Sequence, residues 1–190
     1  DKKMLQLYIT TELSLNQCND CFFVQLSNVI DPEFVYGDYL YVTTTSSGLP
    51  QHFKNLVDIL FKKKIISNKS KILEIGSNDG TLLNYFQTKG CKVLGVDPAK
   101  DIVSSLKNNF ETITKIFNYD LSKNILTEHE QFDLVIANNV IANIDDLNDT
   151  FKAIHLLLKD NAFFVMETFS LFGVIRNNLI DNIYHEHLSY

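Results

Sequence analysis

Four proton-active side chains, Tyr184-His185-Glu186-His187, follow one another near the end of the sequence. Histidine titrates near neutral pH and can take up a proton at modest cost, so acid–base catalysis is the main interpretation of this segment. If the segment is extended, His185 and His187 share one face, with Tyr184 and Glu186 on the other. Two histidines at this spacing would also suit an iron or zinc site completed by Glu167. A pair of structural histidines is the third interpretation.

A second group of candidate residues surrounds the loop GSNDG at residues 76–80, which follows the apolar run of residues 71–75. Gly76 and Gly80 carry no β-carbon, so the backbone there can turn sharply and approach a ligand closely. Glu74 is a charged residue inside the preceding strand, which suggests that it reaches into a pocket. Asp97 ends the next strand, where a carboxylate suits the two hydroxyl groups of a ribose. These residues predict a nucleotide-cofactor site.

The loop favours S-adenosylmethionine over a dinucleotide such as NAD. A dinucleotide site needs G-x-G-x-x-G, and this loop lacks the middle glycine that makes room for a pyrophosphate. Asp79 would also place negative charge where a diphosphate should lie, whereas a cofactor with a sulfonium and no phosphate fits that charge. A strand–helix–strand unit without a ligand is the alternative. The convergence of Glu74, Asp79 and Asp97 on one edge of the sheet disfavours it.

Strands and helices alternate along the chain, which indicates an α/β fold with a Rossmann-like, doubly wound, mostly parallel sheet. We expect strands at residues 71–75, 93–96, 112–117, 132–137 and 161–167. We expect helices at residues 51–64, from residue 82 to Gly90, at residues 101–109 with Leu106 facing inward, and from Asp145 or Asp146 to residue 158. The polar residues at the strand ends then belong to one edge, as in the ligand sites of open parallel sheets.

Several stretches carry a resemblance to a known family: LEIGSNDGTLL with VLGVDPA at residues 73–99, CNDCFFVQL at 18–26, DPEFVYGDYLYVTTTS at 31–46, ANNVIANIDDLND at 137–149 and YHEHLSY at 184–190. The chain resembles the class I S-adenosylmethionine-dependent methyltransferases, and more narrowly the bacterial nucleotide-sugar C-methyltransferases that act on deoxysugars. We therefore expect the cofactor to contact Glu74, Gly76, Asn78, Asp79, Gly80, Asp97, Pro98, Asp120, Asn138 and Asn139.

One of these assignments has an equal alternative. In class I methyltransferases the segment at residues 117–120 flanks the adenine, which would make Asp120 part of an adenine wall. Asp120 also stands where a helix should begin, and an aspartate there can serve simply as a helix cap.

The narrower resemblance implies methylation of the carbon beside the carbonyl of a nucleotide-linked 4-keto deoxysugar. It implies that His187 is the base that forms the enolate and that Tyr184 and Glu186 orient the sugar; His185 is a further catalytic candidate. Asn143 departs from the family, whose members often carry histidine there. Two alternatives therefore stay open: an O- or N-methyltransferase of another small molecule, and a non-catalytic nucleotide-binding module.

The N-terminal region contains a C-x-x-C sequence, Cys18-Asn-Asp-Cys21. Two thiolates on a tight turn form half of a tetrahedral zinc site. The resemblance implies a small zinc-binding domain whose other cysteine pair lies upstream of residue 1. The alternative is a pair of reduced thiols on a β-hairpin, and a redox role is a weaker one.

Aromatic residues follow this region at Phe34, Tyr36, Tyr39 and Tyr41. Their default interpretation is a hydrophobic wrap over the next helix. The resemblance adds that this segment lies beside the active site, which makes Tyr36 and Tyr41 candidate pocket residues.

Bulk properties set the bounds on these interpretations. The 190 residues, with 45% hydrophobic and 21% charged side chains, suit one main globular domain. A net charge of −6 argues against non-specific nucleic-acid binding. The three cysteines form no disulfide framework, and no signal peptide or membrane-spanning run is present, so a cytoplasmic protein is expected. We expect residues 1–50 to be the remnant of a zinc-binding, substrate-side domain and residues 51–190 to be the cofactor domain of a fragment whose C-terminal domain is absent. The sequence leaves the oligomeric state open.

Overall fold

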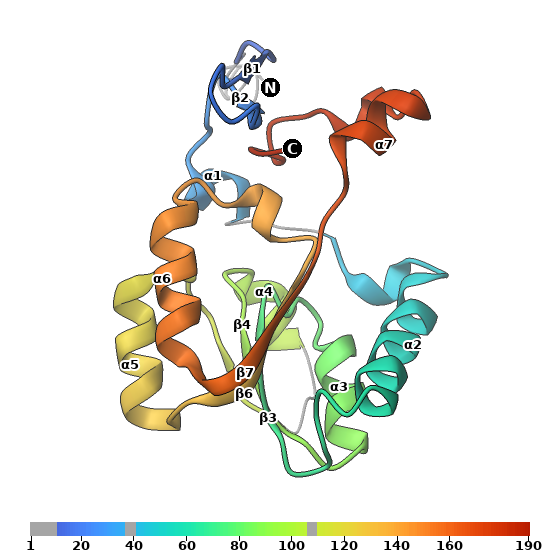
Figure 1. Cartoon of the computed structure of the whole chain (residues 1–190), viewed down its shortest axis with the longest axis vertical. Helices are drawn as coiled ribbons and strands as arrows, with labels where there is room; N and C mark the ends of the chain where they lie inside the picture. The colour runs from blue at the N-terminus through green and yellow to red at the C-terminus, as the bar shows by residue number, and fades with distance from the viewer. Residues whose placement is uncertain (1–10, 37–40, 106–109) are drawn as a thin grey trace, which may run out of the picture.

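A computed structural model describes residues 11–36, 41–105 and 110–190 of the chain. Its main sheet has five parallel strands in the order β5-β4-β3-β6-β7 (Figure 1). This arrangement confirms the predicted α/β fold. The strands are β3 (Lys71–Ile75), β4 (Lys92–Val96), β5 (Thr112–Ile113), β6 (Phe132–Asn138) and β7 (Leu158–Glu167).

Helices cover both faces of this sheet, with α2 and α3 on one side and α5 and α6 on the other (Figure 1). The α-helices are α1 (Pro32–Tyr36), α2 (Leu49–Lys62), α3 (Thr81–Thr88), α4 (Lys100–Ser105), α5 (Tyr119–His129), α6 (Leu147–Leu157) and α7 (Leu171–Arg176). Short 3-10 helices lie at η2 (Thr43–Thr45), η3 (Ile141–Asn143) and η4 (Ile180–Asn182).

The two apolar cores follow from the alternation of side chains along the strands. Leu73 and Ile75 of β3 face one core, which they form with α5 and α6. Ile72 faces the other core, together with Phe53 of α2 and Phe86 of α3. Both cores exclude water from the central strands, so polar groups there are confined to the strand ends.

The predicted β5 is shorter than expected, because the chain leaves the sheet after Ile113. The Lys115 amide donates a hydrogen bond to the Ile113 carbonyl at 3.0 Å, which turns the backbone away from β4. Residues 115–118 therefore form a loop above the sheet instead of a strand. Of the helix expected at residues 101–109, the structure describes the part up to Ser105, which belongs to α4. Leu106 and Tyr39 lie outside the described residues.

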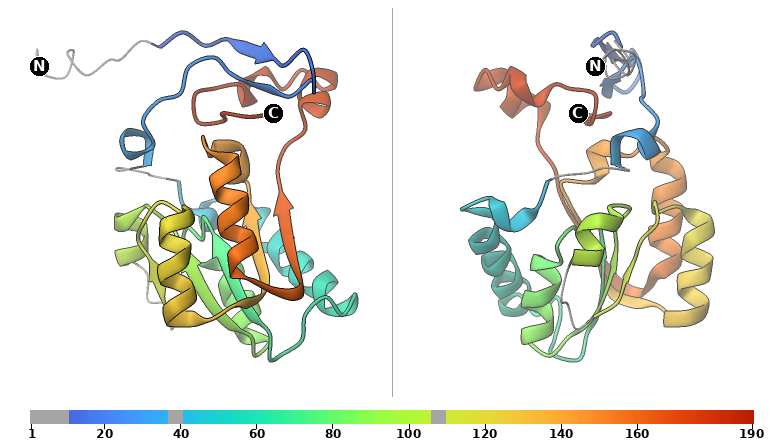
Figure 2. Two further views of the ribbon diagram at one scale, coloured as in Figure 1. Left: turned by 60° about the vertical axis from the view of Figure 1, so that its left-hand side comes forward. Right: turned by 180° about the vertical axis from the view of Figure 1, so that it is seen from behind.

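A small antiparallel hairpin, β1 (Leu15–Gln17) with β2 (Val24–Leu26), forms the N-terminal part of the described chain. The C-terminal residues lie beside it (Figure 2). The Leu26 amide donates to the Leu188 carbonyl at 2.9 Å, and the Tyr190 amide donates to the Val24 carbonyl at 2.9 Å. The hairpin thus fixes the segment that directly follows the YHEH sequence.

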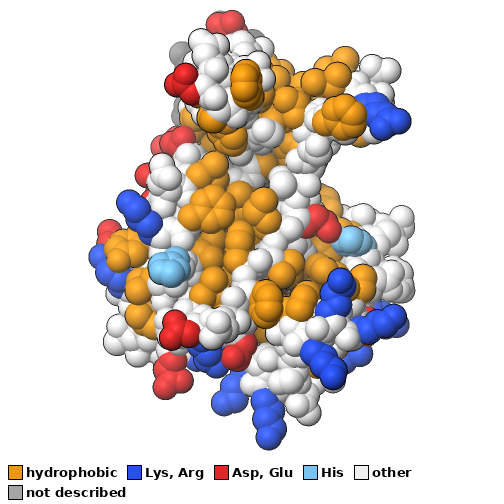
Figure 3. Space-filling view, in the orientation of Figure 1, with side chains coloured by type: hydrophobic (Ala, Val, Ile, Leu, Met, Phe, Trp, Pro, Cys, Tyr) orange, Lys and Arg blue, Asp and Glu red, His pale blue; other side chains and the backbone are white. Residues whose placement is uncertain are grey.

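Strand β7 lies at one end of the sheet order and is half exposed. Its side chains Phe163 and Met166 are each 46% exposed. Hydrophobic side chains are accordingly visible across the centre of the surface in Figure 3. Among the described residues, no helix has both the length and the apolar character needed to cross a membrane.

Asp133 ties three neighbouring strands together at the edge opposite the polar strand ends. Its carboxylate accepts the Lys71 amide of β3 at 2.7 Å and the Lys159 ammonium of β7 at 2.7 Å. Partial burial raises the pKa of this carboxyl, but the hydrogen bonds from Lys159 and Lys71 outweigh that effect and hold the pKa below its ordinary value.

We predict that Asp133→Ala lowers the free energy of unfolding by about 1 kcal/mol at pH 7, because two hydrogen bonds to a charged acceptor are lost. A carboxyl whose pKa is lower in the folded state stabilises above its unfolded pKa and loses that effect as the pH falls through the folded value. The difference between variant and wild type should therefore shrink below about pH 4. Urea unfolding at a series of pH values measures the difference in free energy of unfolding between the two proteins. A difference that stays constant with pH would contradict the lowered pKa of Asp133.

Candidate active site

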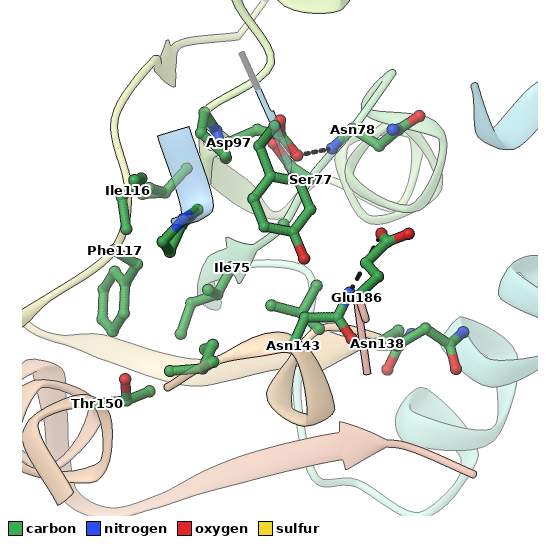
Figure 4. Close-up of a pocket in the computed structure, with 18 of the residues that line it drawn as sticks. Ile75, Ser77, Asn78, Asp97, Ile116, Phe117, Asn138, Asn143, Thr150 and Glu186 are labelled. Atoms are coloured by element: carbon green, nitrogen blue, oxygen red, sulfur yellow. Dashed lines mark hydrogen bonds between the residues drawn. The ribbon is translucent and has the colours of Figure 1, made fainter. Parts of the chain in front are cut away.

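A cavity of about 590 Å³ opens at the carboxyl ends of β3, β4 and β6. Figure 4 shows residues from all three strands around it, with Ile75, Asp97 and Asn138 among those labelled. Of the sequence-predicted site residues, the following line the cavity: Glu74, Gly76, Asn78, Asp97, Pro98, Asn138, Asn139, Tyr184, Glu186 and His187. The polar strand ends thus meet at one edge of the sheet, as the alternation of elements predicts.

At Gly76 the loop of residues 76–80 comes very close to Val140 on the neighbouring cavity wall. Its φ angle is +72°, and a β-carbon at this position would collide with Cγ2 of Val140. The Gly76 amide donates to the Val96 carbonyl at 2.8 Å, which joins the end of β3 to the end of β4. A side chain here would push these walls apart, so glycine is required by both conformation and space.

Asp97 is buried at the end of β4 and holds two loops together. One carboxylate oxygen accepts the Asn78 amide at 2.7 Å (Figure 4), and the other accepts the Ala99 amide at 2.8 Å. Burial raises the pKa of Asp97, and the two amide hydrogen bonds oppose that rise. Each carboxylate oxygen keeps a second acceptor site, so the group can still accept two ribose hydroxyls.

Glu74 is a buried carboxyl with an unsatisfied oxygen. It is 3% exposed, and its Oε2 has no hydrogen-bond partner. Burial first, and then the charges of Asp97 and Asp79, raise the pKa of Glu74 well above its ordinary value, although a hydrogen bond from the Leu83 amide opposes them. A cation placed in this cavity would favour the ionised form of Glu74.

Further buried polar atoms of the cavity wall lack partners: Ser77 Oγ, both amide atoms of Asn138, and Asn143 Oδ1. Buried polar groups in folded proteins are normally satisfied, so such a concentration indicates a ligand that supplies the missing hydrogen bonds. A nucleoside with an amino-acid tail offers both donors and acceptors and fits the unpartnered atoms of Ser77 and Asn138. Sequence reasoning missed Ser77, because a serine inside a turn gives no signal that distinguishes it from a turn former.

Asn78 and Asp79 use their side chains differently from the prediction. Asn78 Oδ1 accepts the Thr43 amide at 2.9 Å, and Asp79 Oδ2 accepts the Thr44 amide at 2.8 Å. Asp79 Oδ1 also accepts the Thr81 amide at 3.0 Å at the start of α3. Neither Asp79 nor Gly80 lines the cavity, so these two predicted contacts are corrected to structural roles.

The part of the cavity expected to hold adenine is lined by residues 115–118, among them Phe117 and Asn118. Asn118 caps helix α5, because its Oδ1 accepts the Leu121 amide at 2.8 Å. Asp120 lies two residues further on, in the first turn of α5, where it is exposed to solvent and paired with Lys123. Asp120 therefore lies outside the cavity, which corrects its predicted cofactor role, and the capping role belongs to Asn118.

The YHEH segment forms a turn instead of an extended strand, with the His187 amide donating to the Tyr184 carbonyl at 3.1 Å. The turn places Tyr184, Glu186 and His187 on the cavity wall. His187 Nδ1 lies 2.8 Å from the Asn182 carbonyl, which can only accept, so Nδ1 carries the proton. Nε2 is then the acceptor nitrogen, and the Tyr184 hydroxyl, 3.2 Å away, can donate to it.

His185 points away from the cavity, and its Nε2 lies 3.3 Å from the Glu12 carbonyl. Glu167, the proposed third metal ligand, pairs with His52 of α2. Within the described ranges no three His, Cys, Asp or Glu side chains group as metal ligands do, so the structure does not bring His185, His187 and Glu167 together. These positions correct the catalytic assignment of His185.

Tyr36 and Tyr41 both line the cavity, as the resemblance implies. Burial first, and then the charge of Glu186, raise the pKa of Tyr36, and a hydrogen bond with Asn143 opposes that rise. Phe169 also lines the cavity, and its ring centroid lies 4.3 Å from that of His187. Sequence reasoning missed Phe169, since an aromatic residue just after a strand is usually part of the core.

Cys18 and Cys21 are exposed, free thiols in the turn of the hairpin. Hydrogen bonds from the Cys21 and Asp20 backbone amides lower the pKa of Cys18. That geometry favours a thiolate, which is the form that binds zinc. Zinc binding by this pair stays a prediction.

Comparison with known proteins agrees with this geometry. A family model described as a methyltransferase domain matches residues 49–190. The chain is 32% identical over 174 residues to C-methyltransferase NovU of Streptomyces niveus, an alignment that covers 91% of this chain and 41% of that protein. It is 26% identical over 99 residues to a ubiquinone biosynthesis O-methyltransferase of Bradyrhizobium diazoefficiens, covering 52% of this chain and 39% of that protein.

The chain therefore spans less than half the length of these curated relatives. Among solved structures, the PH0226 protein from Pyrococcus horikoshii OT3 superimposes with a TM-score of 0.55 at 22% identity, over 75% of this chain and 65% of that one. This likeness shows a shared fold.

We predict that the affinity for S-adenosylmethionine rises with pH above about pH 4.5, the ordinary range of a glutamate. The raised pKa of Glu74 favours its protonated form in the empty cavity, and that proton must be released for the carboxylate to face a cation, so binding is weaker at low pH. Glu74→Gln should bind more weakly at high pH and lose most of this pH dependence. Isothermal titration calorimetry across the pH range measures the affinity of wild type and of Glu74→Gln for S-adenosylmethionine.

The ligand-free protein supplies the control. A carboxyl whose pKa is raised in the folded state stabilises below its unfolded pKa, and that contribution is lost as the pH rises through the folded value. Glu74→Gln should therefore unfold at a higher temperature than wild type at pH 7 without ligand. A variant that is less stable than wild type and binds with the same pH dependence would show that Glu74 is a structural carboxylate.

Proposed function

Because this chain belongs to the class I S-adenosylmethionine-dependent methyltransferases, we propose that it methylates a carbon atom of a nucleotide-linked 4-keto deoxysugar. The observation that carries the proposal is the orientation of His187. Its Nδ1–H donates to the Asn182 carbonyl, and its Nε2 lies beside the Tyr184 hydroxyl on the cavity wall. A base so oriented suits the removal of a proton from a carbon acid.

The cofactor would be held by the acidic floor of the cavity. Asp97 would accept the ribose hydroxyls, and Glu74 would face the positively charged end of the molecule, since both carboxyls are buried at the strand ends. When bound, S-adenosylmethionine supplies a methyl group on a positively charged sulfur, which needs no metal for its activation. The remaining task of the protein is to form the carbon nucleophile and align it.

The residues of the turn would form that nucleophile together. His187 Nε2 would take the proton from the carbon beside the sugar carbonyl, which leaves an enolate with negative charge on oxygen. Burial and the charge of Glu186 raise the pKa of Tyr184 to about 12, so its hydroxyl keeps its proton. As His187 Nε2 takes up the carbon proton, the hydroxyl would turn from Nε2 to the enolate oxygen and donate to it. Glu186, held by Asn143 Nδ2 at 3.4 Å, would orient the sugar hydroxyls.

A second candidate is methylation of an oxygen or a nitrogen of another small molecule. Asn143 favours it, because an amide has no proton-transfer role where the resembling sugar methyltransferases often carry histidine. His187 could deprotonate a hydroxyl as well as a carbon acid. The mass and fragmentation of the product would separate the two reactions.

The domain roles belong to the same proposal. Residues 1–50 would form a zinc-binding, substrate-side unit, and residues 51–190 the cofactor domain. The hydrogen bonds that join β2 with Leu188 and Tyr190 support a role of the hairpin in positioning the turn at residues 184–187.

We predict that His187→Gln lowers the turnover of a thymidine diphosphate-linked 4-keto-6-deoxyhexose by about 10²- to 10⁴-fold, the usual contribution of a general base. Glutamine keeps a donor for the Asn182 carbonyl, so the affinity for S-adenosylhomocysteine should change little. Mass spectrometry of the product gives the rate and locates the methyl group.

His185→Gln is the matched control, since that side chain faces the Glu12 carbonyl and not the cavity. It should keep nearly wild-type turnover. Equal losses in both variants, or full activity of His187→Gln, would contradict the role of His187 as the base.

A further inference from the structure

Asn143 presents a buried acceptor atom whose identity is fixed by its neighbours. Its Nδ2 lies 3.4 Å from Oε1 of Glu186, and a carboxylate can only accept. The nitrogen of the amide must therefore face Glu186, and the same side chain also hydrogen-bonds with Tyr36. The remaining atom, Oδ1, is a carbonyl oxygen that is buried and has no partner.

The position of Asn143 separates it from the expected cofactor contacts. In Figure 4 it lies next to Glu186, away from Ile116 and Phe117 on the expected adenine side and from Asp97 at the end of β4. It also shares the cavity wall with Tyr184 and His187. A substrate placed beside His187 would lie next to this residue and could supply the missing donor.

We propose that Asn143 determines substrate specificity by accepting, through Oδ1, a hydrogen bond from a hydroxyl or amino group of the substrate close to the carbon that is methylated. The inference deepens the proposed sugar methyltransferase function and rests on it. The amide cannot take up a proton, so it selects for a donor without competing with His187 for the proton of the reacting carbon.

A site with a buried acceptor rejects a substrate that lacks the donor, because the acceptor then loses water without a replacement. The amide oxygen is an acceptor only, so it suits a hydroxyl or an amine and disfavours a group that carries only acceptors. Asn143→Leu keeps the number of side-chain heavy atoms and the branching at Cγ, and it removes both the donor to Glu186 and the unpartnered oxygen.

The test compares sugars that differ in one substituent. Thymidine diphosphate-linked 4-keto-6-deoxyhexoses with hydroxyl, amino or hydrogen at carbon 2 or carbon 3 are titrated into the protein saturated with S-adenosylhomocysteine. At one of these positions, the hydroxyl or amino sugar should bind about 10- to 100-fold more tightly than the deoxy sugar. Tighter binding of the amino sugar would identify an ammonium as the donor, and tighter binding of the hydroxyl sugar an alcohol.

Asn143→Leu should bind the three sugars within about threefold of one another and keep wild-type affinity for S-adenosylhomocysteine, which shows that the variant is folded. Wild type that binds the deoxy sugars as tightly as the others would overturn the role of Asn143 and leave the proposed function standing. So would a preference that persists in Asn143→Leu. If wild type binds none of these sugars, both proposals fail.

Discussion

The two hydrogen bonds of the Asp97 carboxylate shape the site more than any other interaction. They join the loop after β3, through the Asn78 amide, to the turn after β4, through the Ala99 amide. A carboxylate that accepts backbone amides on both oxygens is held in one orientation, and its remaining lone pairs then have a fixed direction. Gly76 permits this arrangement because a side chain would collide with Val140.

A second set of contacts positions the turn at residues 184–187, which carries the proposed base. The Ala142 carbonyl accepts the amides of Leu188 and Ser189 at 2.7 and 3.0 Å, and strand β2 pairs with the same C-terminal residues on the other side. His187 directly precedes this doubly held segment. Because Ala142 adjoins Asn143, the amide of Asn143 and the proposed base His187 share one rigid support. Asp97 and His187 thus line one cavity although they are far apart in the sequence.

The fold was predictable from local patterns, because β3 is an apolar run bounded by turn formers and its expected limits, residues 71–75, are those observed. Glu74, Asp97 and His187 were predictable as cavity residues, since parallel strands end at one edge and the family motif marks the histidine. The side-chain roles of Asn78 and Asp79 were not, because they depend on Thr43 and Thr44, which are 35 residues away. Likewise, the turn that separates His185 from His187 depends on Asn182 and Ala142, which no local pattern indicates.

A crystal structure with S-adenosylhomocysteine tests the central claim most directly. The account predicts that the two ribose hydroxyls bind the Asp97 carboxylate, that the amino group of the tail lies beside Glu74, and that the thioether sulfur faces His187 across the cavity. A nucleoside bound with its ribose away from Asp97, or a dinucleotide with its pyrophosphate over Gly76, would contradict it.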